Sequence, residues 1–164
     1  MHEPTAGEHA ATPPTTSQDV IYMRRCLELA RRALAAGDVP VGALIVREGH
    51  VIGEGYERTR ACLDPAAHAE IEAIRDACRT LGSLDLSGAT LYTTVEPCVL
   101  CAYGVRQTRI RRVVFGVRAG ALGGASGPYP LLTDTASTAH AAPPVVQEGV
   151  LAEQCRRLLE ERRP

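Results

Sequence analysis

Hydrophobic residues recur with the spacing of a helix in some stretches of the chain and with that of a strand in others. The first helical stretch covers 19–36 and keeps its apolar residues on one face: Val20, Met23, Cys26, Leu27, Ala30 and Leu34. The same criteria predict further helices at 66–81, 98–107 and 150–162, and strands at 41–46, 51–55, 89–95, 112–117 and 145–148. Strands that alternate with helices predict an α/β fold with one central sheet and helices on both of its faces.

Two stretches follow neither period. Residues 1–18 are rich in Pro, Thr, Ala and His, which predicts a disordered tail and leaves 19–164 as a single domain. Residues 118–144 are heavy in Gly, Ala, Ser and Pro, and loops this long are usually functional or disordered. The apolar cluster at 129–134 within it predicts packing, either over the functional site or elsewhere on the surface.

Composition limits the class of protein. The chain shows no pattern of a signal peptide or a membrane span, and its six cysteines lack the spacing of a disulfide scaffold, so we expect a cytoplasmic protein with reduced thiols. All eighteen basic residues are arginine, and the formal charge is −1. This balance is typical of a metabolic enzyme and argues against a dedicated nucleic-acid binder. Two groups of arginines could still favour RNA: Arg106, Arg109, Arg111 and Arg112, and Arg156, Arg157, Arg162 and Arg163.

One pair of motifs carries the chemistry. His68 is followed by Glu70, and Pro97 is followed by Cys98 and Cys101. A catalytic zinc takes three protein ligands and keeps one position for water. We predict that His68, Cys98 and Cys101 bind one Zn²⁺, while Glu70 stays off the metal and moves protons as the catalytic acid and base.

The residues around the motifs predict where these groups lie. Asp64-Pro65 is a turn signal, so His68 and Glu70 are expected in the first turn of the helix that follows. Pro97 is expected to open the next helix. Two helix N-termini would then face one metal and favour the thiolate form of the cysteines.

Two other interpretations of the cysteine pair are possible. A C-x-x-C pair can be redox-active, or it can belong to a closed structural zinc site. A structural site needs a fourth ligand, and Cys62, six residues before His68, is the best candidate. The histidine, the two cysteines and the nearby glutamate together favour the catalytic site.

The complete pattern resembles the cytidine deaminase-like superfamily, in the branch that holds tRNA adenosine, guanine and fungal-type cytosine deaminases. The similarity lies in residues 38–43, 64–70 and 96–101. It implies a three-layer α/β/α sandwich with a central mixed five-stranded sheet, one catalytic zinc per subunit and a homodimer.

The resemblance also implies substrate contacts. The peptide N–H of Ala69 is expected to bind a ring atom of the substrate, and the carbonyl of Glu96 to accept from the leaving amine. Val41, Tyr129 and Asp134 complete the substrate contacts that we predict.

The sequence departs from the branch at Glu57, where most members have an asparagine that holds the base, and at Ala66, where a threonine is common. An asparagine both donates and accepts, whereas an ionised carboxylate only accepts. Glu57 therefore suits a ring that presents N–H donors, as guanine does, better than adenine. Alternatively, Glu57 faces solvent or pairs with Arg58 or Arg60.

Three functions follow from these observations. The first choice is a zinc-dependent hydrolytic deaminase of a small nucleobase-like ring or nucleoside, guanine first and cytosine next. The alternative is a tRNA wobble-adenosine deaminase, because 111–118 and 147–151 resemble the tRNA enzymes while 73–78 and 91–94 resemble the free-base enzymes. A non-catalytic zinc-stabilised protein is the third.

Overall fold

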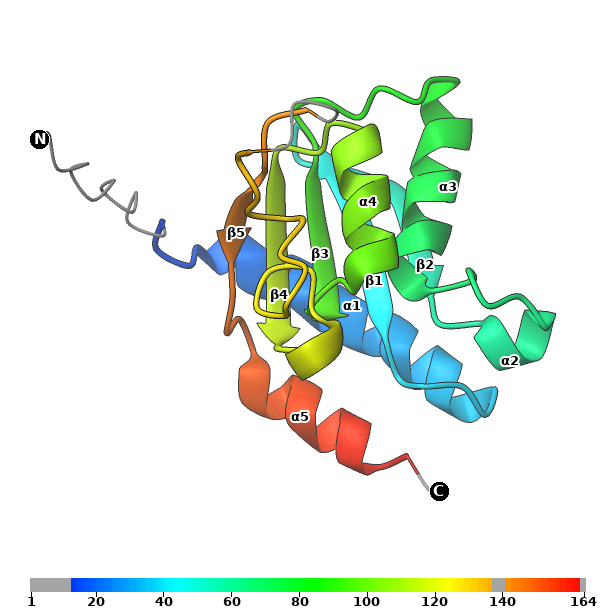
Figure 1. The fold of residues 1–164 in the computed structure, drawn as a ribbon. Coiled ribbons are helices and arrows are strands. Elements are labelled where there is room, and N and C mark those ends of the chain that lie inside the picture. Colours follow the sequence, from blue (N-terminus) through cyan, green and yellow to red (C-terminus); the bar gives the residue numbers. More distant parts are fainter. Residues whose placement is uncertain (1–12, 137–140, 163–164) are drawn as a thin grey trace, which may run out of the picture.

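A five-stranded sheet lies between two layers of helices (Figure 1). The structure is a computed structural model, which describes residues 13–136 and 141–162. The strands are β1 (Gly42–Arg47), β2 (His50–Tyr56), β3 (Thr90–Val95), β4 (Arg112–Val117) and β5 (Val145–Gln147). Their order is β2-β1-β3-β4-β5, with antiparallel pairs at β1–β2 and β1–β3 and parallel pairs at β3–β4 and β4–β5. The mixed sheet expected from the resemblance is confirmed.

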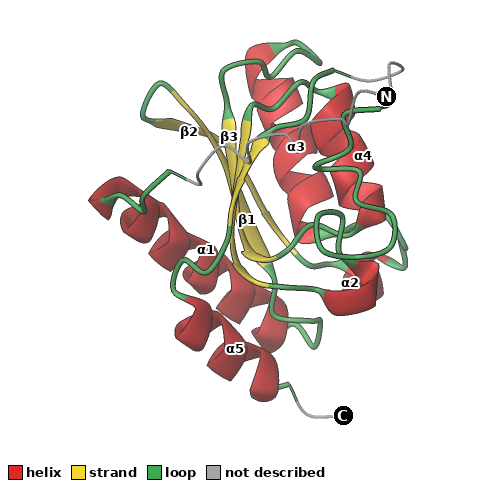
Figure 2. Ribbon diagram, turned by 60° about the vertical axis from the view of Figure 1, so that its left-hand side comes forward, coloured by secondary structure: helices red, strands yellow, loops and turns green. Residues whose placement is uncertain are grey.

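The helices divide between the two faces of the sheet (Figure 2). Helices α1 (Ser17–Ala35) and α5 (Ala152–Glu160) cover one face. Helices α3 (Ala69–Leu81) and α4 (Val99–Gln107) cover the other, and the short α2 (Thr59–Cys62) lies in the connection between β2 and α3. None of the helices in the described part of the chain has both the length and the apolar character needed to cross a bilayer.

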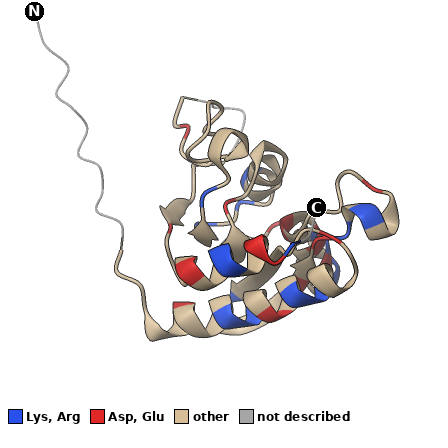
Figure 3. Cartoon of the chain, turned by 90° about the horizontal axis from the view of Figure 1, so that it is seen from below, with Lys and Arg blue, Asp and Glu red and all other residues tan. Residues whose placement is uncertain are grey.

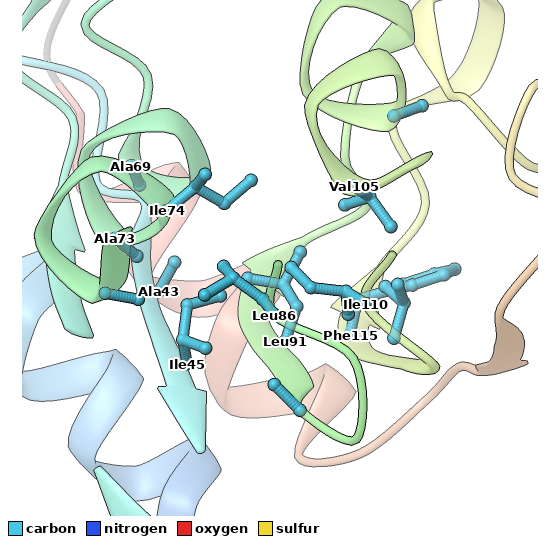
Figure 4. Packing of buried hydrophobic residues seen from close by; sticks show 14 of the residues in the cluster. Ala43, Ile45, Ala69, Ala73, Ile74, Leu86, Leu91, Val105, Ile110 and Phe115 are labelled. Carbon is cyan, nitrogen blue, oxygen red and sulfur yellow. The ribbon is translucent and has the colours of Figure 1, made fainter. Parts of the chain in front are cut away.

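Alternate residues of the inner strands pack on opposite faces of the sheet. In β1, Ala43 and Ile45 pack in the core under α3 and α4, whereas Leu44 and Val46 pack against α1. Figure 4 shows Ala43 and Ile45 close to the residues of α3 that cover them. Because both faces are covered, the strand is a continuous apolar run rather than an alternating one.

Small residues bring α3 unusually close to the sheet. A Cβ atom on Gly55 would lie 2.1 Å from the carbonyl oxygen of Ala69, and one on Gly53 would lie 2.3 Å from that of Ala73. Only glycine fits at these two strand positions, so the backbone of α3 packs directly on β2. This contact fixes the N-terminal end of α3, where His68 and Glu70 lie.

The elements differ from the prediction mainly at their ends. Helix α1 begins at Ser17, because Thr16 and Asp19 form a capping box, and α3 begins at Ala69 rather than at 66. Helix α5 begins at Ala152, after two residues with positive φ, Gly149 and Leu151. Helix α2 and the 3-10 turn at Gly120–Leu122 were not predicted. The predicted tail over 1–18 falls mainly on 1–12, which lie outside the described residues.

Candidate active site

Three potential metal ligands meet where β3 ends and two helices begin. His68 Nδ1 lies 3.5 Å from Cys98 Sγ and 3.6 Å from Cys101 Sγ, and the two sulfur atoms are 3.7 Å apart. No fourth His, Cys, Asp or Glu donor joins this group among the described residues. Cys62, the candidate for a closed structural site, lies exposed on α2.

These distances match those that zinc requires. A tetrahedral zinc with bonds of about 2.3 Å to sulfur and about 2.0 Å to nitrogen would hold two sulfurs about 3.8 Å apart, and a sulfur and a nitrogen about 3.5 Å apart. One imidazole and two thiols are also donors that zinc prefers. The three residues therefore fit a zinc ion that keeps its fourth position free of protein.

Both ligand-bearing segments place their donors at helix N-termini. His68 is the N-cap residue of α3, and Cys98 is the N-cap residue of α4, so neither lies inside its helix. Pro97 precedes α4 by two residues, while Cys101 lies in its first turn. The hydrogen bonds from Cys101 and His68 lower the pKa of the Cys98 thiol to about 4, although burial opposes them. Cys98 is thus set up as a thiolate ligand.

Glu70 lies beside the metal ligands without joining them. Its side chain is only 4% exposed, and its Oε2 is 3.4 Å from Cys101 Sγ. Its other oxygen accepts a 2.9 Å hydrogen bond from the hydroxyl of Thr93 on β3. Burial raises the pKa of Glu70 to about 7, and the positive charge of a bound zinc would lower it again. A buried carboxyl held at this place can pass a proton at the metal site.

Glu57 does not face solvent, and no ion pair with Arg58 or Arg60 holds it. It is 7% exposed, and its carboxylate lies against the start of α3. Burial raises its pKa, while His68 and hydrogen bonds from Thr59 and the peptide N–H of Ala69 act against the rise. The two groups that we expected to contact substrate separately, Glu57 and the Ala69 N–H, therefore contact each other. Val41 is buried next to them, and its carbonyl accepts the N–H of Glu57 at 3.0 Å.

The chain between β4 and β5 forms a groove with the first residue of α4. The groove has a volume of about 450 Å³ and is lined by Val99, which follows the ligand Cys98, and by residues of the 128–134 stretch. Tyr129 and Asp134 both line it, and Tyr129 is 72% exposed. The structure places these two predicted contacts in the groove, next to the metal-binding segment.

A family comparison decides what kind of protein carries this site. Residues 16–117 match the model of the cytidine and deoxycytidylate deaminase zinc-binding region, and the matched range contains all three ligands and Glu70. The chain belongs to this deaminase family. Zinc is accordingly the cofactor of the domain, and the three-layer fold is the one that the resemblance implied.

Curated relatives of the deaminase domain are named tRNA-specific adenosine deaminases. The protein from Bacillus subtilis is 39% identical over 139 residues, which is 85% of this chain and 84% of that protein. The one from Aquifex aeolicus is 44% identical over 94 residues, which is 57% of this chain and 62% of that protein.

Two solved structures that resemble this chain come from enzymes with different substrates. A structure from a study of A-to-I editing by tRNA:A34 deaminases has a TM-score of 0.78 and 35% identity, and covers 84% of this chain and 98% of that chain. A guanine deaminase from Nitrosomonas europaea has a TM-score of 0.71 and 27% identity, and covers 99% of this chain and 98% of that chain.

Three side chains of the deaminase site carry roles that the sequence did not predict. Thr93 bonds Glu70, as described above. The side chain of Glu96, expected to act only through its carbonyl, accepts hydrogen bonds from backbone N–H groups of 119–126. Arg106 is buried and donates to the carbonyls of Leu131, Asp134 and Ala141. Their partners lie 23 to 35 residues away in sequence, and no local pattern announces such contacts.

The arginines in the described part of the chain do not form one basic surface. In the first predicted group, Arg106 is buried and Arg112 forms an ion pair with Asp19. The prediction that these two arginines belong to an exposed basic cluster is therefore wrong. Arg156 and Arg157 of α5 pair with Glu153. Figure 3 views the molecule from below and shows acidic and basic residues interspersed along its helices.

Proposed function

We propose that this protein is a zinc-dependent deaminase that converts adenosine to inosine at the wobble position of tRNA. The observation that carries the proposal is the similarity to a tRNA:A34 deaminase structure, whose TM-score of 0.78 and identity of 35% exceed the 0.71 and 27% of the guanine deaminase from Nitrosomonas europaea. Relatives named tRNA-specific adenosine deaminase support it independently. The first choice made from the sequence, a guanine-like base, has less support.

The residues of the site suit the hydrolytic removal of an amine. A bound zinc supplies Lewis acidity, which lowers the pKa of a water molecule and makes it a nucleophile near neutral pH. With zinc bound, Glu70 would take one proton from the attacking water and deliver it to the ring nitrogen, and would then carry the second proton of the same oxygen to the departing amine. Thr93 holds the Glu70 carboxyl in place through its 2.9 Å contact. Ammonia and inosine are the products.

An adenosine in an RNA loop must leave its stack to reach the half-buried His68 and Cys98 and the buried Glu70. Enzymes of this class take an unpaired or flipped nucleotide into the pocket. The groove between Val99 and the 128–134 stretch extends the site beyond one base. We keep the homodimer as part of the proposal. Leu100 and Tyr103 of α4 are 44% and 49% exposed, and they offer an apolar face to a second copy.

The proposal is tested with an anticodon stem-loop that carries adenosine at the wobble position. Zinc-loaded protein should form inosine in this RNA, detected by nucleoside chromatography after digestion, and it should release no ammonia from free guanine. Because phosphate contacts contribute to RNA affinity, KM for the stem-loop should rise with salt. Ammonia from guanine with no inosine in the stem-loop would contradict the proposal.

Guanine is the second candidate, and one observation favours it. The buried carboxylate of Glu57 is an acceptor beside the metal ligands, and guanine presents donors along its edge. The variant Glu57→Gln separates the two candidates, since an amide offers both a donor and an acceptor. Stem-loop activity should persist or rise in this variant, whereas guanine turnover should fall if guanine is the substrate.

A further inference from the structure

The metal-binding segment carries a buried charged side chain at each end. Glu96 precedes Pro97 and Cys98, and Arg106 lies in the last turn of α4. Both are 2% exposed. Both bind the backbone of the connection between β4 and β5, Glu96 to its first part and Arg106 to its second. This connection is therefore attached to the segment that holds two of the three metal ligands.

The carboxylate of Glu96 accepts four hydrogen bonds. Its Oε2 accepts from the N–H of Ala119 at 2.9 Å and from the hydroxyl of Ser126 at 2.7 Å. Its Oε1 accepts from the N–H of Ala125 at 2.9 Å and from that of Ser126 at 2.7 Å. Four donors on one carboxylate are enough to stabilise its buried charge. No atom of this carboxylate is left to bind substrate or metal.

The turn held by Glu96 returns to the backbone of the ligand Cys98. The N–H of Gly124 donates to the carbonyl of Pro97 at 2.8 Å, and Gly123 forms a bridge with Cys98. A Cβ atom on Gly123 would lie 2.4 Å from the nearer carboxylate oxygen of Glu96. The turn thus contacts the ligand segment by backbone on one side and Glu96 on the other.

We propose that Glu96 is a positioning residue for the zinc site. Through the turn at 123–126 it holds the backbone of Cys98, and with it the thiolate, at the distance that the metal requires. The side chain of Glu96 does not touch the metal or the reacting atoms. Residues that orient metal ligands from outside the coordination sphere commonly change metal affinity by about 10- to 100-fold.

The test measures how fast zinc leaves the protein. Zinc-loaded wild-type protein and Glu96→Gln are mixed with an excess of a chromogenic chelator, well below the melting temperature, and zinc release is followed by absorbance. Gln keeps the size of the side chain but turns an amide donor toward N–H groups that need an acceptor. We expect release to be about 10-fold faster or more in Glu96→Gln. Release at the wild-type rate from folded Glu96→Gln would overturn the proposal, even if its melting temperature falls.

Two further variants make the result specific. Ser126→Ala removes only the hydroxyl donor to Glu96, and its release rate should lie between those of wild type and Glu96→Gln. If Glu96→Gln does not fold, Ser126→Ala decides, and an unchanged release rate then overturns the proposal. Glu153→Gln changes an exposed carboxylate on α5 and should release zinc as wild type does. Faster release in this control would also overturn the proposal, because the effect would then not be specific to Glu96.

The absorption spectrum of a substituted metal provides a second test of the proposal. With Co²⁺ in place of Zn²⁺, the sulfur-to-metal absorption of Glu96→Gln should differ from wild type if the Cys98 thiolate has moved, and identical spectra would count against the proposal. Neither measurement uses a substrate. The inference can therefore fail while the tRNA proposal stands, and the reverse also holds.

Discussion

Glu70 and Glu96 are both buried acids beside the metal ligands, yet their surroundings are opposite. Burial raises the pKa of Glu70, although its own backbone N–H, the Thr93 hydroxyl and the Cys101 thiol donate to it. Burial also acts to raise the pKa of Glu96, but hydrogen bonds led by that of the Ser126 hydroxyl outweigh it and lower the value. Burial outweighs the hydrogen bonds at Glu70, whereas the four hydrogen bonds outweigh burial at Glu96, and this balance separates a group that can exchange protons from one that stays ionised.

This difference assigns the two acids different work. A carboxylate with four donors is fixed in place, and moving it would leave several buried N–H groups without partners. A carboxyl with few partners can gain and lose a proton without rearranging the backbone around it. In this site Glu96 is fixed in place and holds the backbone of 119–126, whereas Glu70 can take up and release a proton.

The largest effect is expected from Glu70→Gln. The amide cannot take up or deliver the proton, so kcat should fall by about 10²- to 10⁴-fold. The melting temperature should stay close to that of wild type, because the amide oxygen can still accept from Thr93. Deamination and thermal melting of the same preparation check both points. An active Glu70→Gln would mean that Glu70 does not transfer the proton, and that it does not differ from Glu96 in this respect.

Arg106→Met should give the next largest effect. Arg106 is the positively charged counterpart of Glu96, and three carbonyls of the 131–141 stretch lose their donor when it is replaced. We expect a loss of about 2–4 kcal/mol in the free energy of unfolding, measured with urea. Arg109→Met, at an exposed arginine three residues further along the chain, should change it by less than about 1 kcal/mol. Equal effects from both variants would show that burial of the guanidinium contributes little.

Asp19 extends the comparison to an acid far from the metal. Burial acts to raise its pKa, but hydrogen bonds from Arg112, Thr16 and Tyr92 lower it below the ordinary value of 3.8. A carboxyl with a lowered pKa in the folded state stabilises the fold above its unfolded pKa, and this contribution is lost as the pH falls below about 4. Wild type should thus exceed Asp19→Asn in stability near neutral pH, and the gap should narrow on acidification. Urea midpoints at several pH values check this, and a gap independent of pH would contradict it.

Ser126→Ala should reduce stability less than Arg106→Met does. One of the four hydrogen bonds to Glu96 is lost, while the three from backbone N–H groups remain. We expect a loss of about 1 kcal/mol in the free energy of unfolding. A loss as large as that in Arg106→Met would mean that the hydroxyl, rather than the backbone, holds the carboxylate.

The sequence predicted those features that depend on local patterns. Apolar spacing located the five strands and the long helices, and the metal motif located His68, Cys98, Cys101 and Glu70. The start of α3 was wrong by three residues, because the turn after Asp64 extends to Ala67 before the helix begins. Helix ends depend on such turns, which periodicity does not report.

Contacts between distant segments could not be predicted. The partners of Glu96 and Arg106 are backbone groups, whose positions depend on how the 118–144 stretch folds. Glu57 was predicted to contact substrate, but its contact with the Ala69 N–H follows from the close packing of α3 on β2, which depends on Gly53 and Gly55. In the same way, the arginines that look clustered in sequence point to different surroundings in the fold.

The zinc content of purified variants tests most directly whether three ligands hold the metal while Glu70 works beside it. Wild type and Glu70→Gln should each contain about one zinc per chain, as expected for a site with three protein ligands, whereas Cys98→Ala should lose most of its zinc. Metal analysis by mass spectrometry gives the answer without any assumption about substrate. A Glu70→Gln protein without zinc, or a Cys98→Ala protein that retains it, would contradict this assignment.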